Sequence, residues 1–288
     1  MAQNSKIEWT DSTFNPWVGC TKISRAARAP SACDFCYAEG WAKRSGHVKW
    51  GNNPRRRTTE SYWQAPLKWN AAATEFRLKH GHRQRIFCAS LADVFDNQVD
   101  RVWRSDLWRL IRECDQLDWQ LLTKRPQNIS KMLPKDWGQG YANVWLGTTA
   151  EDAAAYQQRG AHLLAVPAVV HFVSYEPAMG PLGALSITGR VPDWLIIGGE
   201  SGVALSRTRP THPQWARDAI AECARVGTAS FLKQWGRYSN NPLVVEQDFT
   251  EREAKEIDPV SNGKGGGLLD GRLHREFPKI RGIATAAA

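Results

Sequence analysis

Short apolar runs recur along the chain, and the stretches between them are longer and more polar. Runs of about four to eight residues that are apolar almost throughout are typical of parallel strands buried on both faces. Alternation of such strands with helices predicts a right-handed parallel barrel or open sheet. The runs predicted to be strands are residues 15–20, 85–90, 119–123, 143–148, 169–174, 193–198 and 228–233.

The stretches between these runs include three that predict amphipathic helices. In residues 102–114, apolar side chains such as Leu107 and Ile111 recur on one helical face. Residues 151–165 and 213–226 also predict helices. Because strand and helix alternate from residue 85 onward, we expect an α/β protein whose sheet is a partial or full parallel (β/α) barrel.

Two segments interrupt the alternation. Residues 39–80 form a long, basic and tryptophan-rich insertion after the first predicted strand, which we expect to be helical. Residues 246–288 form a polar C-terminal extension with a glycine-rich loop at 262–267. We therefore expect one barrel domain over residues 1–245, insertion included, and an extension that packs on the barrel or trails from it.

Polar side chains follow five of the apolar runs, at the point where each strand is predicted to end. In βα folds the carboxyl ends of the strands share one face, and binding sites are built there. The alternative is that each of these polar ends is merely a helix N-cap. Five of them together favour one site assembled from several strands. They are residues 90–93, 123–125, 148–151, 174–176 and 198–200.

The chain is basic, with 38 Lys and Arg against 29 Asp and Glu and a formal net charge of +9. This excess favours anionic partners such as nucleic acids or nucleotides. It is concentrated in residues 22–57, which hold nine basic and two acidic residues. Most of the 14 tryptophans are expected to pack in the core, with base stacking as the alternative for some.

The hydropathy pattern indicates neither export nor membrane insertion. The longest apolar run, residues 163–170, is far below the about 20 residues of a membrane span. The first residues of the chain lack the apolar region of a secretory signal. We therefore expect a cytoplasmic protein with no membrane partner.

Three of the six cysteines are clustered, at Cys20, Cys33 and Cys36. Thiolates separated by two residues can both turn onto one metal centre. Three thiolates without a fourth suit a [4Fe–4S] cluster with one iron open to a ligand. Spacing alone leaves two alternatives, which are a zinc site completed by His47 and inert cysteines. The remaining cysteines have apolar neighbours and are expected in the core; they are Cys88, Cys114 and Cys223.

The clustered cysteines stand in stretches by which the chain resembles the radical S-adenosylmethionine (SAM) enzymes. More closely, it resembles a phage- and prophage-associated family of three-cysteine-motif proteins related to them. Most radical SAM enzymes carry C-x3-C-x2-C, whereas twelve residues separate Cys20 from Cys33 here. The stretches that carry the resemblance are residues 14–24, 33–39, 121–126, 144–147, 174–177, 197–202, 231–236 and 268–272.

This resemblance implies a radical SAM-type barrel with a [4Fe–4S] cluster on Cys20, Cys33 and Cys36. It further implies that SAM binds the open iron and is cleaved by one electron, giving methionine and a 5′-deoxyadenosyl radical that takes a hydrogen atom from the substrate. An electron donor is then required as a partner. With the basic charge, the resemblance favours DNA, RNA or a nucleotide as the substrate of a repair or modification reaction.

Candidate site residues follow from the resemblance and from the predicted strand ends. Catalytic roles are expected for Lys124, Glu176 and Glu200, with a structural ion pair between Glu176 and Lys124 or Arg125 as the alternative for Glu176. Asp93 suits the SAM amino group, with a helix cap as its alternative. The residues expected to bind the cofactor are Tyr37, Ser90, Asp93, Lys124, Thr148, Glu151, Gly198 and Gly199, with Lys233 and Gln234 completing the ring.

Two other functions remain open from the sequence. In the first, a zinc ion or a cluster stabilises a nucleic-acid-binding module that catalyses nothing. In the second, a cluster protein senses or transfers electrons without cleaving SAM. Metal analysis separates the first from the radical enzyme, and an assay for 5′-deoxyadenosine separates the second.

Overall fold

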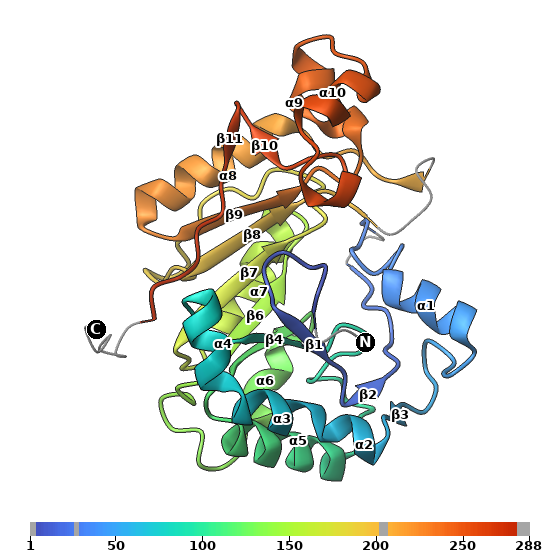
Figure 1. Ribbon diagram of the computed structural model, residues 1–288, viewed down its shortest axis with the longest axis vertical. Coiled ribbons are helices and arrows are strands. Elements are labelled where there is room, and N and C mark those ends of the chain that lie inside the picture. Colours follow the sequence, from blue (N-terminus) through green and yellow to red (C-terminus); the bar gives the residue numbers. More distant parts are fainter. Residues whose placement is uncertain (1–3, 26–28, 202–206, 281–288) are drawn as a thin grey trace.

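The computed structural model describes residues 4–25, 29–201 and 207–280. Its centre is a parallel sheet whose strands follow one another in chain order and curl into a half-barrel (Figure 1). This confirms the expectation of an α/β fold with a partial parallel barrel. The strands are β1 (Ser12–Phe14), β4 (Arg85–Cys88), β5 (Asp118–Thr123), β6 (Val144–Thr149), β7 (Val170–Tyr175), β8 (Trp194–Gly198) and β9 (Ala229–Gln234).

The first strand lies earlier than predicted. Residues 12–14 pair with residues 86–88 of β4, whereas a strand was predicted over residues 15–20. Pro16 has no backbone N–H to donate to a ladder, and the chain leaves the sheet there. The next residues instead form β2 (Trp17–Val18), which pairs antiparallel with β3 (Arg56–Arg57) of the insertion.

The three predicted helices are confirmed as α5 (Arg101–Glu113), α7 (Ala153–Leu164) and α8 (Pro213–Val226). Asp100 caps α5 by accepting a hydrogen bond from a backbone N–H of the first turn, and Asp152 caps α7 in the same way. A further short helix, α6 (Ile129–Met132), precedes β6. No helix within the described ranges is long and apolar enough to span a membrane.

The insertion divides into two parts. The helices α2 (Glu60–Trp63), α3 (Ala65–Ala71) and α4 (Ala73–His80) lie on the side of the sheet that carries α5 (Figure 1). The helix α1 (Tyr37–Ser45) lies apart from them, near the carboxyl ends of the strands. Only this second part is placed to contact a site at those strand ends.

The C-terminal extension covers the free edge of the sheet. It begins at the end of α9 (Pro242–Glu246) and contains α10 (Glu251–Ile257) and the hairpin of β10 (Leu268–Leu269) and β11 (Arg272–Leu273). Beyond the hairpin, the chain runs antiparallel to β9, and the N–H of Leu232 donates to the carbonyl of His274 at 2.7 Å. This pairing shields an edge strand that would otherwise expose its backbone groups.

A cluster of aromatic side chains fills the concave side of the half-barrel. Its buried members come from five strands and from the segment before β1. The contacts are close, with the rings of Trp9 and Phe87 4.7 Å apart and those of Trp194 and Phe231 5.9 Å apart. The cluster contains Trp9, Phe87, Trp145, Phe172, Trp194 and Phe231.

Gly147 of β6 lets the Phe172 ring pack against the sheet. A Cβ at this position would lie 2.4 Å from the ring, which is inside van der Waals contact. We expect Gly147→Ala to lower the free energy of unfolding by about 1–3 kcal/mol through overpacking, as measured by chemical denaturation. Adding Phe172→Leu removes the clash, so the double variant should lose less than the sum of the single variants. Wild-type stability of Gly147→Ala would contradict this packing.

Candidate active site

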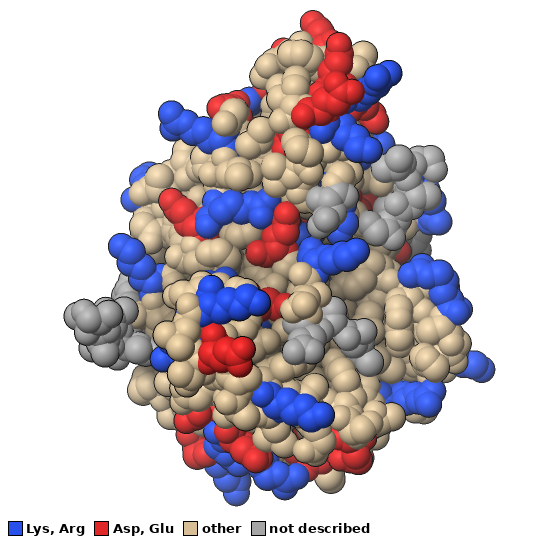
Figure 2. Space-filling view, viewed as in Figure 1, with Lys and Arg blue, Asp and Glu red and all other residues tan. Residues whose placement is uncertain are grey.

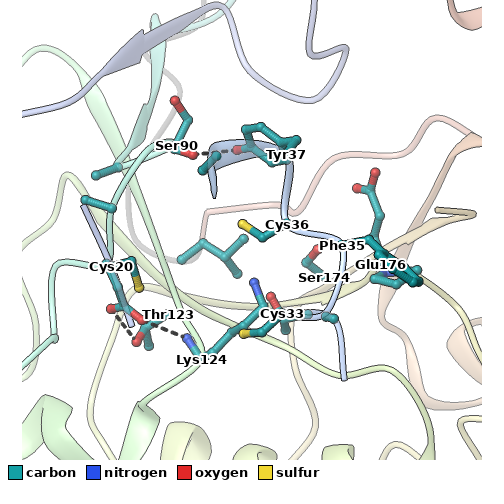
Figure 3. A pocket seen from close by; sticks show the side chains of 18 of the residues that line it. Cys20, Cys33, Phe35, Cys36, Tyr37, Ser90, Thr123, Lys124, Ser174 and Glu176 are labelled. Atoms are coloured by element: carbon teal, nitrogen blue, oxygen red, sulfur yellow. Dashed lines mark hydrogen bonds between the residues drawn. The ribbon is translucent and has the colours of Figure 1, made fainter. Parts of the chain in front are cut away.

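A cavity of about 400 Å³ opens at the carboxyl ends of the strands (Figure 3). Trp9, Phe87 and Leu122 of the concave core form part of its apolar lining. Polar residues at or just after six successive strands contribute to the lining, as the strand-end rule predicts. They are Ser90, Lys124, Thr149, Glu176, Glu200 and Lys233.

All three clustered cysteines line this cavity. Cys20 follows β2, whereas Cys33 and Cys36 lie in the loop that leads into α1, and Cys36 is the N-cap residue of that helix. None of the three is in a disulfide. Two chain segments on different sides of the pocket therefore present thiols to the same space (Figure 3).

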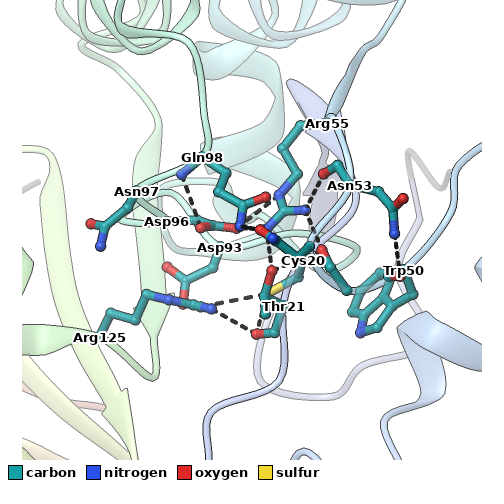
Figure 4. A network of polar contacts seen from close by, with 12 residues as sticks. Cys20, Thr21, Trp50, Asn53, Arg55, Asp93, Asp96, Asn97, Gln98 and Arg125 are labelled. Atoms are coloured by element: carbon teal, nitrogen blue, oxygen red, sulfur yellow. Dashed lines mark hydrogen bonds and ion pairs between the residues drawn. The ribbon is translucent and has the colours of Figure 1, made fainter.

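Arg125 connects the Cys20 loop to the loops after β4 and β5 (Figure 4). Its Nη1 lies 3.5 Å from the Cys20 Sγ and 3.1 Å from the Asp93 Oδ2, and its Nη2 donates to the Thr21 carbonyl at 2.6 Å. The pKa of the Cys20 thiol is raised to about 12, chiefly by burial and in part by the Asp93 carboxylate, while Arg125 opposes the rise. A bound metal would supply the charge that this thiolate needs.

Arg55 fixes the same loop from the other side (Figure 4). Its Nε and Nη2 donate to the Asp96 Oδ2 at 2.8 and 2.5 Å, and its Nη2 also donates to the Thr21 Oγ1 at 2.7 Å. Both side chains of the ion pair are almost fully buried. Sequence reasoning missed this role, because Arg55 stands in a run of three arginines that indicated a basic surface.

Glu151 holds the segment before Cys33. Its Oε1 accepts a hydrogen bond from the Ala32 N–H at 2.8 Å, and its Oε2 accepts one from Arg159 at 2.6 Å. Glu151 is fully buried and lies outside the cavity lining. Glu151 was expected to bind the cofactor, but in the structure it positions the cysteine loop.

Tyr37 joins α1 to the loop after β4. Its hydroxyl donates to the Ser90 carbonyl at 2.7 Å, and the Ser90 hydroxyl accepts from the Asn15 amide at 3.0 Å. Tyr37 and Ser90 both line the cavity, as expected for residues that contact a cofactor.

Lys124 extends toward the cysteines. Figure 3 shows its side chain reaching toward Cys33 and Cys36. Burial acts to lower the pKa of the Lys124 ammonium, but the nearby thiols and the carboxylates of Glu151 and Asp93 outweigh it, so the pKa is raised. Lys124 therefore carries a positive charge into the part of the cavity that the cysteines line.

The Asp93 carboxylate accepts several hydrogen bonds at the wall of the cavity. It accepts from the Thr123 hydroxyl at 2.7 Å, from the Lys124 N–H at 3.2 Å and from Arg125. It also accepts from the N–H of Phe95, two residues along the chain. This turn-forming role is close to the helix-cap alternative considered for it.

Three other predicted residues lie outside the cavity lining. Thr148 is buried and donates to the Thr123 carbonyl at 2.9 Å. Gly198 and Gly199 do allow a close approach, but the approaching groups belong to the protein itself. A Cβ on Gly199 would lie 2.1 Å from the Trp235 carbonyl oxygen, and one on Gly198 would lie 3.2 Å from the Glu176 carboxyl group.

The two glutamates expected to be catalytic are both ion-paired. Glu176 accepts from the Lys233 ammonium at 2.5 Å and from the Gln234 amide at 3.1 Å, so its ion-pair partner is Lys233. Arg209 binds Glu200 through both its backbone N–H and its side chain. Both glutamates line the cavity. Each carboxylate is held by a basic side chain, that of Glu176 by Lys233 and that of Glu200 by Arg209.

The described residues contain no group of three or more His, Cys, Asp or Glu side chains placed to hold one metal ion. His47, the expected fourth ligand of a zinc site, lines a separate pocket together with Trp41 and Arg56. His47 therefore does not line the cavity that the three cysteines share. The ligands of a [4Fe–4S] cube bind different iron atoms, so their sulfurs need not surround a single point.

The chain can be compared with protein-family models, with curated proteins and with solved structures. A protein-family model described as "Protein of unknown function (DUF5131)" matches residues 4–278. No curated protein and no solved structure matches the chain.

Proposed function

This chain belongs to the DUF5131 family, and we propose from its site that it is a radical SAM-type enzyme. In this proposal Cys20, Cys33 and Cys36 hold a [4Fe–4S] cluster, and SAM occupies the adjoining cavity. The substrate is a nucleic acid or nucleotide, and the reaction is repair or modification. The proposed reaction requires the reducing environment of the cytoplasm and an electron donor.

The observation that carries the proposal is the convergence of the three thiols on one cavity. Thiolates are the donors that iron–sulfur clusters prefer. Three of them leave one iron without a protein ligand, and the cavity beside them provides space for that ligand. Its volume of about 400 Å³ lies within the usual range for pockets that bind small molecules or cofactors. On these grounds we infer that the residues present fit the group.

The chain's own residues would bind and orient the cofactor. Lys124 offers an ammonium to the carboxylate of SAM at the cysteine end of the cavity. The apolar lining formed by Trp9, Phe87 and Leu122 excludes water from the reacting atoms. A [4Fe–4S] cluster held by Cys20, Cys33 and Cys36 would supply the one-electron reduction of SAM, the chemistry by which radical SAM enzymes start hydrogen-atom abstraction.

Glu176 and Lys233 are the polar groups placed to face the substrate. Their ion pair lines the cavity at the ends of β7 and β9, whereas Cys20 follows β2 and Cys33 and Cys36 precede α1. A pair of this kind can hold a substrate through both a donor and an acceptor. We assign Glu176 to substrate binding or proton transfer, and we assign Glu200, held by Arg209, to positioning.

The test is anaerobic reconstitution with iron and sulfide, followed by dithionite and SAM. We expect about four iron atoms per chain and formation of 5′-deoxyadenosine by the wild type, but not by Cys36→Ala. A stable cluster without 5′-deoxyadenosine would replace the proposal by a role in sensing or electron transfer. Zinc without iron after anaerobic purification would replace it by the non-catalytic binding module.

A further inference from the structure

The sheet of the half-barrel is open between β1 and β9, and the C-terminal extension meets the segment before β1 across this gap. The Ser261 hydroxyl donates to the Glu8 Oε2 at 2.9 Å and also bonds to the Lys233 carbonyl. Arg275 lies 3.3 Å from the same Glu8 oxygen. Two segments distant in sequence therefore form one wall, and Ile7 and Lys264 from this wall line the cavity.

The loop that carries Lys264 is held in a defined conformation. Gly265 and Gly266 have φ values of +85° and +77°, and a Cβ on Gly266 would lie 2.1 Å from the Asp258 carboxylate. That buried carboxylate accepts hydrogen bonds from the N–H groups of Gly267 and Leu268, both at 2.9 Å. The backbone beside Lys264 is therefore fixed before any ligand binds.

The charge of Lys264 is not balanced by the groups around it. Within the described ranges Lys264 makes no ion pair, whereas the nearby carboxylates of Glu176 and Glu8 pair with Lys233 and Arg275. Burial lowers the pKa of Lys264, and the charges of Lys233 and Lys6 lower it further, while Glu176 and Glu8 act in the opposite direction. An anion bound here would relieve this repulsion.

We propose that Lys264 forms a phosphate-binding subsite at this gap, which holds the backbone of a single-stranded nucleic acid while one base is turned toward the mouth of the cavity. The inference rests on the proposed function and names its substrate class. A duplex is too wide for a cavity of about 400 Å³ in which SAM is bound, so a single base must leave its stack to reach the mouth of the cavity. The phosphates of the strand remain outside the cavity, on the side of Lys264, which lines the cavity and is also exposed to solvent.

The experiment measures binding of a fluorescein-labelled ten-residue oligothymidylate to the reconstituted protein by anisotropy, over a range of salt concentrations. Lys264→Gln removes the charge, and Lys255→Gln is the matched control because Lys255 is exposed on α10 of the same extension. We expect Lys264→Gln to weaken binding severalfold and to reduce the slope of log K against log salt by about 0.7, the value for one phosphate contact on a single strand. Lys255→Gln should leave both unchanged.

Equal affinity and slope in Lys264→Gln and the wild type would overturn the subsite, as would the absence of oligothymidylate binding at low salt. A variant that binds SAM more weakly but the oligonucleotide normally would assign Lys264 to the SAM carboxylate, which also overturns it. Iron content and 5′-deoxyadenosine are measured on the same samples. Lys264-dependent binding without a cluster would therefore uphold the subsite while refuting the radical mechanism.

Discussion

Cys33→Ala and Cys36→Ala should each reduce bound iron from about four atoms per chain to near zero. The cavity provides three thiols, and within the described residues no fourth cysteine lines it. Removal of one thiol leaves two ligands for a cube, which is too few to retain it in the presence of a chelator. The measurement is iron and sulfide content after anaerobic reconstitution and desalting, together with the visible absorbance of the cluster.

Cys223→Ala is the matched control. Cys223 is buried in α8 and lies outside the cavity, and burial raises the pKa of its thiol to about 12. This variant should retain wild-type iron while losing some stability, because alanine leaves a small void in the core. Equal iron in all three variants would show that the assignment of Cys33 and Cys36 as ligands is wrong.

The succession of strands along the chain could be predicted because β4 to β9 each contain a short stretch rich in apolar residues. Strands at residues 119–123 and 193–198 were recognised in this way, and they correspond to β5 and β8. The exception is β1, which has only one apolar residue, Phe14, beside the buried polar Ser12 and Thr13. Only its pairing with β4 reveals this strand, and that partner lies about 70 residues away in the sequence.

The expectation that polar residues at the carboxyl ends of the strands build the site predicted where the site lies. It did not predict the direction of every side chain. Neighbouring residues of a strand point to opposite faces, so Thr149 of β6 lines the cavity while Thr148 faces a backbone carbonyl. The contribution of Lys264 could not be predicted, because it depends on the return of the C-terminal extension to the start of the sheet. No local pattern around residue 264 indicates that return.

In the basic insertion, the number of basic residues overstates the positive charge that is left to bind an anionic partner. Arg55 is buried against Asp96, and Arg57 pairs with Glu60 and Asp106 while stacking at 4.0 Å over the Trp63 ring. Of the three consecutive arginines only Arg56 is exposed and outside any ion pair in the described part of the chain. Much of the positive charge that favoured nucleic acid therefore stabilises the fold.

Asp96→Leu should lower the free energy of unfolding by about 3–5 kcal/mol, because it leaves the buried guanidinium of Arg55 without its counter-ion. The exposed fractions of the two side chains are 0% and 3%, so water cannot replace the lost partner. The control is Glu256→Gln on α10, whose ion pair with Arg252 is exposed. Because exposed pairs contribute little, this control should change stability by less than about 1 kcal/mol. Both are measured by chemical denaturation.

The double variant Arg55→Met/Asp96→Leu separates the cost of an unpaired charge from the loss of a contact. Removal of both charges should recover part of the stability lost in Asp96→Leu, since apolar side chains can replace a buried pair at lower cost. Arg55 also binds the Thr21 hydroxyl beside Cys20, so both variants should label faster at Cys20 with a thiol reagent. A loss below about 1 kcal/mol in Asp96→Leu, with Cys20 as protected as in the wild type, would show that this ion pair does not hold the cysteine loop.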